Sequence, residues 1–156
     1  MMKIWIMMDK FEEREIEGRG KWLKMNYNAV LLGKKTIQFT EDKFNPVDFY
    51  MTAGTKTSVG DIKTLHRDYM QYPDFQIDYI KLKEIKDRAT DGRIPYLVVF
   101  FNDYHIVWDL SKIDIEERKH IVNCTATTAQ NYNKGKKEKE EVCLTMQEAI
   151  YVRKAA

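Results

Sequence analysis

An amphipathic pattern near the start of the chain predicts a helix over residues 9–26. Positions at helical spacing form one stripe of Phe11, Glu15, Gly18 and Trp22, with Ile16, Gly20 and Leu23 beside it. Asp9 is suited to capping this helix, and Glu12 and Glu13 suit the positive end of its dipole. Gly18 and Gly20 weaken a helix interior, but the spacing still favours a helix.

Short strand-like runs follow this helix. They cover residues 29–32, 36–40, 47–52 and 57–64. Turns at Gly33 and Gly54 separate them. The spacing then becomes helical again over residues 78–89, where Asp91-Gly92 ends the second helix.

The second half of the chain is rich in strand patterns. Residues 95–101 form a continuous apolar run, which is typical of a strand buried on both faces, and residues 105–110 are its predicted hairpin partner. A short helix is expected over residues 114–122. A last hairpin joins residues 125–132 to 141–146 through a lysine-rich loop, residues 133–140. Together these elements predict an α/β fold with a central mixed β-sheet flanked by helices, in one domain spanning residues 1–156.

Composition limits the classes of protein that remain. The chain is 44% hydrophobic and 32% charged, as ordinary globular proteins are. It holds no run of about 20 apolar residues that could span a bilayer, so we expect a cytoplasmic protein without a membrane partner. Cys124 and Cys143 match no metal-binding spacing and are expected to be free thiols. The net charge of +2 neither requires nor excludes a nucleic-acid partner.

The sharpest chemical feature is the strand segment Val59-Gly60-Asp61-Ile62-Lys63-Thr64. Side chains two apart on a strand point to the same face, so Asp61 and Lys63 project together while Ile62 turns toward the core. Two interpretations are open at this point. The pair is either an ion pair on a solvated sheet or part of a reactive centre.

A second acid favours the reactive centre. Asp48 begins the preceding strand, and an antiparallel pairing of the two strands would bring it close to Asp61. Two adjacent carboxylates repel each other unless a cation lies between them. Mg²⁺ or Mn²⁺ suits such an oxygen-rich site, with the backbone carbonyl of Ile62 as a further ligand. The sequence therefore predicts a metal site that faces a phosphodiester.

The roles of these residues follow from the chemistry of phosphodiester hydrolysis. A metal held by Asp48 and Asp61 would lower the pKa of a bound water and stabilise the negatively charged transition state. Lys63 would orient the attacking water, offset the developing charge, or act as a base if burial lowers its pKa.

This arrangement resembles the PD-(D/E)xK nuclease superfamily, which includes restriction-type endonucleases and archaeal-type Holliday-junction resolvases. Asp48 matches the first acid of the motif, Asp61 the second and Lys63 the lysine. Val47 separates Pro46 from Asp48, so the literal Pro-Asp pair is absent. The resemblance covers roughly residues 11–110 and implies a restriction endonuclease-like fold.

The resemblance also implies further site residues. Members of the family often add a glutamate from the first helix to the metal site, and Glu17 matches the usual placement best among Glu12, Glu13, Glu15 and Glu17. Lys81, near the start of the second helix, corresponds to a region that often sends a polar side chain toward the site. His66 and Arg67 follow the lysine of the motif and are candidate contacts to a nucleic-acid phosphate, with solvated surface as the alternative.

The predicted function is therefore a Mg²⁺- or Mn²⁺-dependent endonuclease acting on DNA. The resemblance to small resolvases and phage-type nucleases implies branched or double-stranded DNA as substrate, a homodimer as the active assembly and a phage as one source of such a chain. Two alternatives are a catalytically inactive nuclease-fold module that binds DNA or protein, and an interaction protein whose Asp-x-Lys is an accidental ion pair. The last alternative predicts that Asp48 lies far from Asp61.

Overall fold

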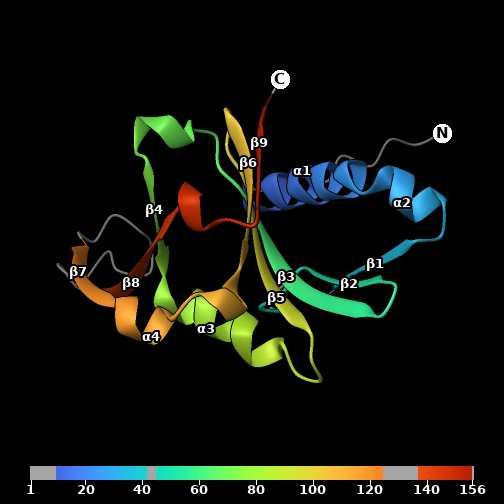
Figure 1. The fold of residues 1–156 in the computed structure, drawn as a ribbon. Coiled ribbons are helices and arrows are strands. Elements are labelled where there is room, and N and C mark those ends of the chain that lie inside the picture. The colour runs from blue at the N-terminus through green and yellow to red at the C-terminus, as the bar shows by residue number, and fades with distance from the viewer. Residues whose placement is uncertain (1–9, 42–44, 125–136, 156) are drawn as a thin grey trace, which may run out of the picture.

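A six-stranded sheet forms the centre of the molecule (Figure 1). The computed structural model describes residues 10–41, 45–124 and 137–155. In spatial order, the strands are β1 (Lys35–Phe39), β2 (Phe49–Ala53), β3 (Lys56–Thr64), β5 (Ile94–Phe100), β6 (Tyr104–Asp109) and β9 (Tyr151–Lys154). Only the β3–β5 pair is parallel, and the other neighbours are antiparallel. The predicted α/β class with a central mixed sheet is confirmed.

Helices lie on both sides of this sheet (Figure 1). Helix α1 (Lys10–Met25) packs against β3 and leads into the short helix α2 (Tyr27–Leu31). Helix α3 (Tyr79–Arg88) packs on the opposite face and belongs to the connection between the parallel strands. A Cβ atom at Gly18 would lie 2.7 Å from Thr64 Oγ1 and 2.8 Å from Ile62 Cγ2. Because Gly18 has no Cβ atom, α1 can approach β3 closely. The packing that results offsets the weak helix propensity of glycine.

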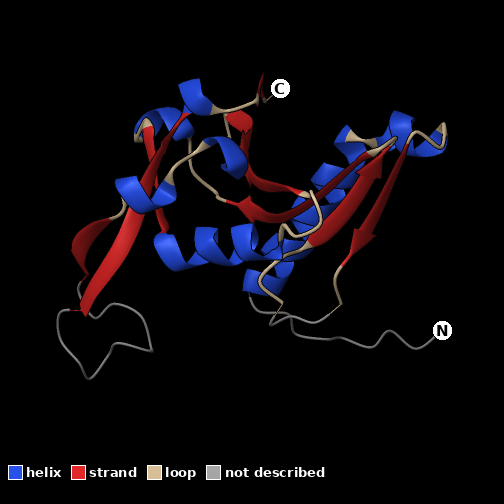
Figure 2. Cartoon of the chain, turned by 60° about the horizontal axis from the view of Figure 1, so that its bottom comes forward, coloured by secondary structure: helices blue, strands red, loops and turns tan. Residues whose placement is uncertain are grey.

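A second, three-stranded antiparallel sheet lies beside the first (Figure 2). Its strands, in spatial order, are β4 (Asp74–Asp78), β8 (Lys137–Thr145) and β7 (His120–Cys124), and the short helix α4 (Ile115–Arg118) precedes β7. In Figure 2 the β7–β8 hairpin extends at one end of the molecule and the β1–β2 edge lies at the other.

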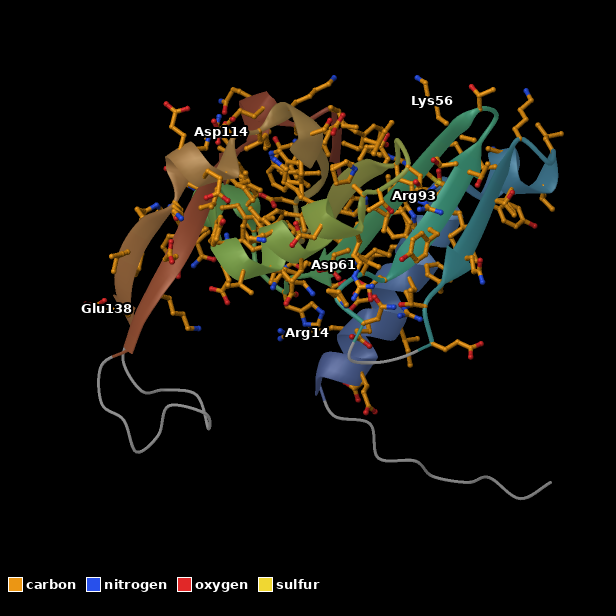
Figure 3. The ribbon with its side chains drawn as sticks, turned by 90° about the horizontal axis from the view of Figure 1, so that it is seen from below. Arg14, Lys56, Asp61, Arg93, Asp114 and Glu138 are labelled. Atoms are coloured by element: carbon orange, nitrogen blue, oxygen red, sulfur yellow. The ribbon has the colours of Figure 1, made fainter. Side chains whose placement is uncertain are left out.

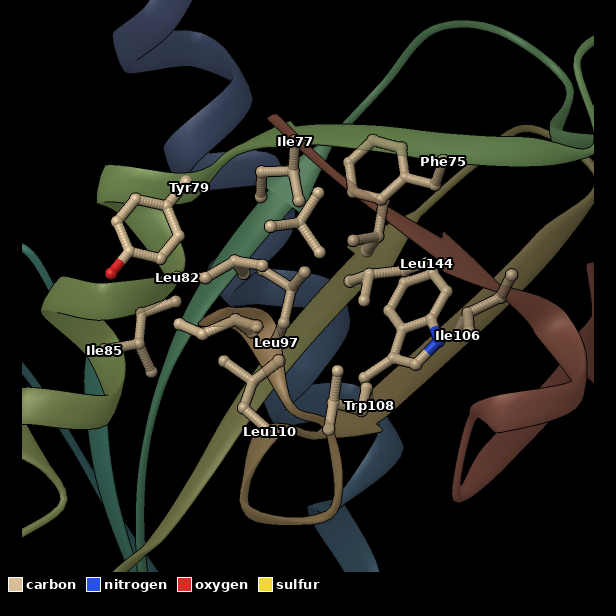
Figure 4. Packing of buried hydrophobic residues seen from close by; sticks show 14 of the residues in the cluster. Phe75, Ile77, Tyr79, Leu82, Ile85, Leu97, Ile106, Trp108, Leu110 and Leu144 are labelled. Atoms are coloured by element: carbon tan, nitrogen blue, oxygen red, sulfur yellow. The ribbon is translucent and has the colours of Figure 1, made fainter. Parts of the chain in front are cut away.

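The two sheets share one hydrophobic core. Leu82 and Ile85 of α3 pack in the same cluster as Trp108 of β6, and this cluster also contains Phe75 of β4 and Leu144 of β8 (Figure 4). A separate cluster between α1 and the other face of the large sheet contains Trp22, Phe49, Ile62, Val98 and Phe100. Each face of β3 and β5 is thus buried, as the apolar run over residues 95–101 predicted.

Several sequence predictions need correction. Residues 29–32 do not form a strand, because the Val30 and Leu32 amides donate to the carbonyls of Asn26 and Asn28 in helical turns. The described residues up to Thr64 therefore form three strands, not the predicted four.

The C-terminal part differs from prediction as well. The helix expected over residues 114–122 ends at Arg118, and residues 120–124 instead form β7. Strand β8 begins at Lys137, inside the predicted loop 133–140. The predicted strand over residues 125–132 lies outside the described residues. The pattern also failed to predict the short strands β4 and β9. Among the described helices, none is both long and apolar enough to cross a membrane.

Candidate active site

Two buried aspartates face each other where β2 begins beside β3. Phe49 pairs with Gly60 in the antiparallel register, so Asp48 lies opposite Asp61. The Asp48 amide donates to the Gly60 carbonyl at 2.8 Å, and the Ile62 amide donates to Asp48 Oδ2 at 2.8 Å. The side chains are almost inaccessible, since Asp48 is 8% exposed and Asp61 is 6% exposed. This proximity contradicts the alternative of an accidental ion pair, which predicts that Asp48 lies far from Asp61.

Burial makes the ionised form of Asp61 costly. Loss of hydration is the largest cause that raises its pKa well above the ordinary value of an aspartate. A hydrogen bond with the Asp48 side chain, and the charge of Asp48, raise the pKa further, while Lys81 and Lys63 oppose the shift. Two carboxylates this close repel each other unless a proton or a cation relieves the repulsion.

Each carboxylate also has a cationic neighbour. Lys81 Nζ lies 3.5 Å from Asp61 Oδ2 and donates to the Pro46 carbonyl at 3.4 Å. Arg19 Nη2, from α1, lies 3.4 Å from Asp48 Oδ1. The sequence predicts that Lys81 contacts a phosphate. In the structure Lys81 lies at the acid pair itself.

The acid pair opens into a cavity of about 320 Å³ between α1 and α3. Figure 3 shows Asp61 between these two helices, with Arg14 near it. Lys63 is half-buried and lines the cavity on the same side of β3 as Asp61. The full lining consists of Arg14, Glu15, Asp48, Asp61, Ile62, Lys63, Thr64, Leu65 and Lys81. Carboxylates lie at the floor of the cavity, and lysine and arginine side chains surround them. Such a site is suited to a metal cation bound to the carboxylates and to an anionic group bound to that metal.

Glu15, and not Glu17, is the α1 carboxylate in this cavity. Glu15 lines the cavity, and its pKa is raised first by burial and next by the charge of Asp48. Glu17 points elsewhere and is paired with Lys21 at 3.2 Å and with His66 at 2.9 Å. Those partners lower the pKa of Glu17, with the hydrogen bond from His66 as the largest cause. The structure thus does not bring Glu17 to the acid pair.

His66 and Arg67 do not line the cavity either. His66 is exposed and bound to Glu17. The Arg67 guanidinium lies over the Phe101 ring at 5.0 Å and over the Tyr72 ring at 5.8 Å, and it donates to the Asp68 carbonyl. Both residues are outside the immediate site.

Sequence reasoning missed Arg14 and Arg19 of α1, and it named Glu15 as a candidate but ranked it below Glu17. A signal for Glu15 was present, because it belongs to the same stripe as Gly18 and Trp22, which pack on the sheet. For Arg14 and Arg19 the sequence carried no comparable signal. A helix arginine is usually solvent-exposed, and only the contact with Asp48 distinguishes Arg19.

The donor set fits a hard divalent cation. In the described part of the chain, no group of three or more His, Cys, Asp or Glu side chains is close enough to hold a metal ion. Mg²⁺, however, is commonly bound through one or two carboxylates, with waters and substrate phosphates as its remaining ligands. The facing pair Asp48–Asp61 supplies two carboxylates, and a cation between them would relieve the repulsion that contributes to the raised pKa of Asp61.

Comparisons with known proteins add a fold-level likeness. No protein-family model matches the chain, and a search of the curated proteins finds no match. Among solved structures, the chain is similar to Hjc, a Holliday junction resolvase from the archaeal hyperthermophile Archaeoglobus fulgidus. The TM-score is 0.49 with 8% sequence identity, over 64% of this chain and 79% of that chain. At this level, the likeness by itself assigns neither a family nor an activity.

Proposed function

We propose that this protein is a metal-dependent nuclease of the PD-(D/E)xK type that hydrolyses phosphodiester bonds in DNA. The observation that carries the proposal is the buried pair Asp48–Asp61 with Lys63 on the same face of β3. The order of elements also supports it, because a helix, a strand led by one acid and a hairpin strand bearing Asp-x-Lys recur here as α1, β2 and β3.

Asp48 and Asp61 are the residues that would hold Mg²⁺ or Mn²⁺. The Ile62 carbonyl is a candidate third ligand, because the N–H of the same residue already reaches Asp48 and both groups leave an extended strand on one side. When bound, such a cation lowers the pKa of a coordinated water and offsets charge on the phosphate. Glu15, in place of the predicted Glu17, would accept hydrogen bonds from the water molecules bound to the ion.

Cationic side chains around the cavity provide the remaining chemistry. Lys63 is placed to orient the attacking water and to neutralise charge that develops on the phosphate oxygens. Lys81 neutralises Asp61 in the free protein, and its ammonium becomes available to a phosphate once a cation takes over that role. Arg14 lines the cavity and supplies a second phosphate contact.

A second candidate function is DNA or protein binding without cleavage. The observation that favours it is that Lys81 and Arg19 already neutralise Asp61 and Asp48. If these ion pairs persist with Mg²⁺ present, the acids cannot hold the ion. The two candidates therefore differ in a single measurable property, which is divalent-cation binding at the acid pair.

The experiment that tests the proposal is cleavage of supercoiled plasmid, linear duplex and a four-way junction. Each substrate is incubated with Mg²⁺, with Mn²⁺ and with EDTA. We expect metal-dependent cleavage that Asp61→Asn abolishes and that Lys63→Ala slows by about 10²- to 10³-fold. A matched control is Asp109→Asn, because Asp109 is also buried, at 8% exposure, but its carboxylate only caps Ser111.

The outcomes separate the candidates. Cleavage that survives in Asp61→Asn would contradict the assigned site. Folded protein that neither binds Mn²⁺ nor cuts any substrate, yet still binds DNA, would replace the nuclease by the binding module.

A further inference from the structure

The two cations at the acid pair lie at long contact distances. Of the two oxygens of Asp48, Oδ2 accepts from the Ile62 amide at 2.8 Å, whereas Oδ1 lies 3.4 Å from Arg19 Nη2. Asp61 Oδ2 lies 3.5 Å from Lys81 Nζ. A close ion pair between such groups has a distance of about 2.7–2.9 Å. Both contacts are longer than that, so a metal ion at the two carboxylates can replace them.

Arg19 is incompletely hydrogen-bonded where it lies. Its guanidinium carbon is 5.3 Å from the centroid of the Phe39 ring, and its Nη2 lies near one oxygen of Asp48. Among the described residues, none accepts a hydrogen bond from its buried Nε. A buried donor without a partner is unfavourable, and a guanidinium binds a phosphate through two parallel N–H groups. A phosphate at the cavity would therefore pair with Arg19 better than Asp48 does.

The charge of the site opposes a metal ion that enters without an anion. The cavity lining and Arg19 together carry three carboxylates and four basic side chains, so their formal charge is +1 when every group is ionised. A divalent cation raises this formal charge to +3. Each phosphodiester group of DNA has a negative charge, and its oxygens accept hydrogen bonds. Such a group would lower the positive charge and bind the cations that leave the aspartates. The groups counted are Glu15, Asp48, Asp61, Arg14, Arg19, Lys63 and Lys81.

We propose that Arg19 and Lys81 are displaceable counter-ions of the acid pair, and that a phosphodiester group of DNA binds them when a divalent cation binds the aspartates. Metal and DNA then bind cooperatively, because the metal frees the two cations for the phosphate and the phosphate frees the carboxylates for the metal. By linkage, DNA raises the affinity for the metal by the same factor as the metal raises the affinity for DNA. The inference rests on the proposed function, and it adds that the free protein binds the metal weakly.

Metal binding to the full chain without DNA tests the role of Arg19. Electron paramagnetic resonance of unbound Mn²⁺ gives the dissociation constant. Arg19→Gln is expected to bind Mn²⁺ about tenfold more tightly than wild type, because it removes the competing cation at Asp48. Lys21→Gln is the matched control, since it removes the same charge from the same helix, but Lys21 is paired with Glu17 outside the cavity. This control should bind Mn²⁺ as wild type does. Equal effects of the two substitutions would overturn the proposal.

The affinity for DNA with and without metal tests the cooperativity. Fluorescence anisotropy measures it on a labelled duplex and on a labelled four-way junction, in EDTA and in Mn²⁺, with phosphorothioate linkages that slow hydrolysis. Wild type is expected to bind at least one of these DNAs about 10- to 100-fold more tightly in Mn²⁺. The gain should be smaller in Arg19→Gln, whose free form already binds the metal, and unchanged in Lys21→Gln. An affinity of wild type that is independent of Mn²⁺ on both DNAs would overturn the proposal.

Failure of this proposal and failure of the proposed function give different results. Metal-dependent cleavage by a wild-type protein whose affinity for DNA is the same in EDTA and in Mn²⁺ would retain the nuclease and overturn the cooperative binding. A folded chain that neither binds Mn²⁺ nor cleaves DNA would overturn both.

Discussion

Both sheets carry a pair of acidic residues, but the two sheets hold them differently. In the three-stranded sheet, Glu138 and Glu140 of β8 are exposed to water, and Glu138 is labelled in Figure 3. Glu140 has a distant cationic neighbour in Lys119, 3.7 Å away. In the six-stranded sheet, Asp48 and Asp61 are buried against each other. The two glutamates lie two residues apart on one strand in water, whereas the two aspartates face each other from neighbouring strands and are removed from water.

That difference has an energetic consequence. Water screens exposed carboxylates, so surface ion pairs contribute little to stability. A buried pair of like charges has no such screening and persists only if a proton or a cation relieves it. The pKa of Asp61 is therefore raised, whereas the glutamates of β8 serve only as a solvated face. The comparison teaches that burial, rather than charge, marks the candidate site.

The largest expected effect is on the rate of cleavage when one lysine in each sheet is substituted. Lys63→Ala is expected to slow single-turnover cleavage by about 10²- to 10³-fold, because it removes a cation aimed at developing charge. Lys139→Ala, on β8 between the two exposed glutamates, is expected to leave the rate unchanged. Equal losses in the two variants would show that the lysines contribute only general electrostatic attraction to the substrate.

A buried leucine tests whether the two regions are energetically separate. Leu144 of β8 is fully buried in the core that also contains Trp108 of the large sheet. Leu144→Ala is expected to cost about 2–5 kcal/mol of the free energy of unfolding. Because the core is shared, calorimetry should show one transition that moves as a whole. A separate low-temperature transition of the small sheet would contradict this.

The effect of substituting Asp61 on the free energy of unfolding is expected to depend on pH. In the unfolded chain, an aspartate has an ordinary pKa of about 3.9. Because the pKa of Asp61 is raised in the folded protein, its carboxyl group keeps a proton to higher pH there. The stability associated with that proton is present below the unfolded pKa and is lost as pH rises through the raised pKa of Asp61. Without metal, Asp61→Asn should therefore gain stability relative to wild type as pH rises through the raised pKa of Asp61.

Urea unfolding of both proteins across this pH range measures the effect. Mg²⁺ is expected to stabilise wild type at high pH and not Asp61→Asn. A constant difference between wild type and Asp61→Asn at all pH values would contradict the raised pKa.

The smallest expected effect distinguishes two glutamates on one helix. Glu15→Gln is expected to weaken Mn²⁺ binding by about tenfold or less, since Glu15 acts through the water ligands of the ion. Glu17→Gln should leave it unchanged, because Glu17 is held by Lys21 and His66. Calorimetric titration with Mn²⁺ measures both. The reverse ranking would return the first-helix role to Glu17.

Local patterns in the sequence determined much of this protein. The helical spacing over residues 9–26, the apolar run over residues 95–101 and the pairing of its hairpin partner depend on neighbours in the chain, so the sequence predicted them. The proximity of Asp48 and Asp61 belongs to the same class. A short hairpin turn at Gly54 fixes their register, and the two-residue period of β3 places Lys63 beside Asp61.

Only the tertiary structure decided the rest. Which glutamate of α1 enters the cavity depends on how the helix is rotated against β3, which is set by Gly18 and Trp22 packing on a sheet that the chain completes much later. The Lys81–Asp61 and Arg19–Asp48 pairs likewise join elements far apart in sequence. Strand β9 has four residues, too few for a periodic signal. Strand β4 alternates over five residues but was not assigned from the sequence, and both strands pair with the edges of longer ones. Local propensity cannot encode such contacts, since their free energy arises only when distant segments meet.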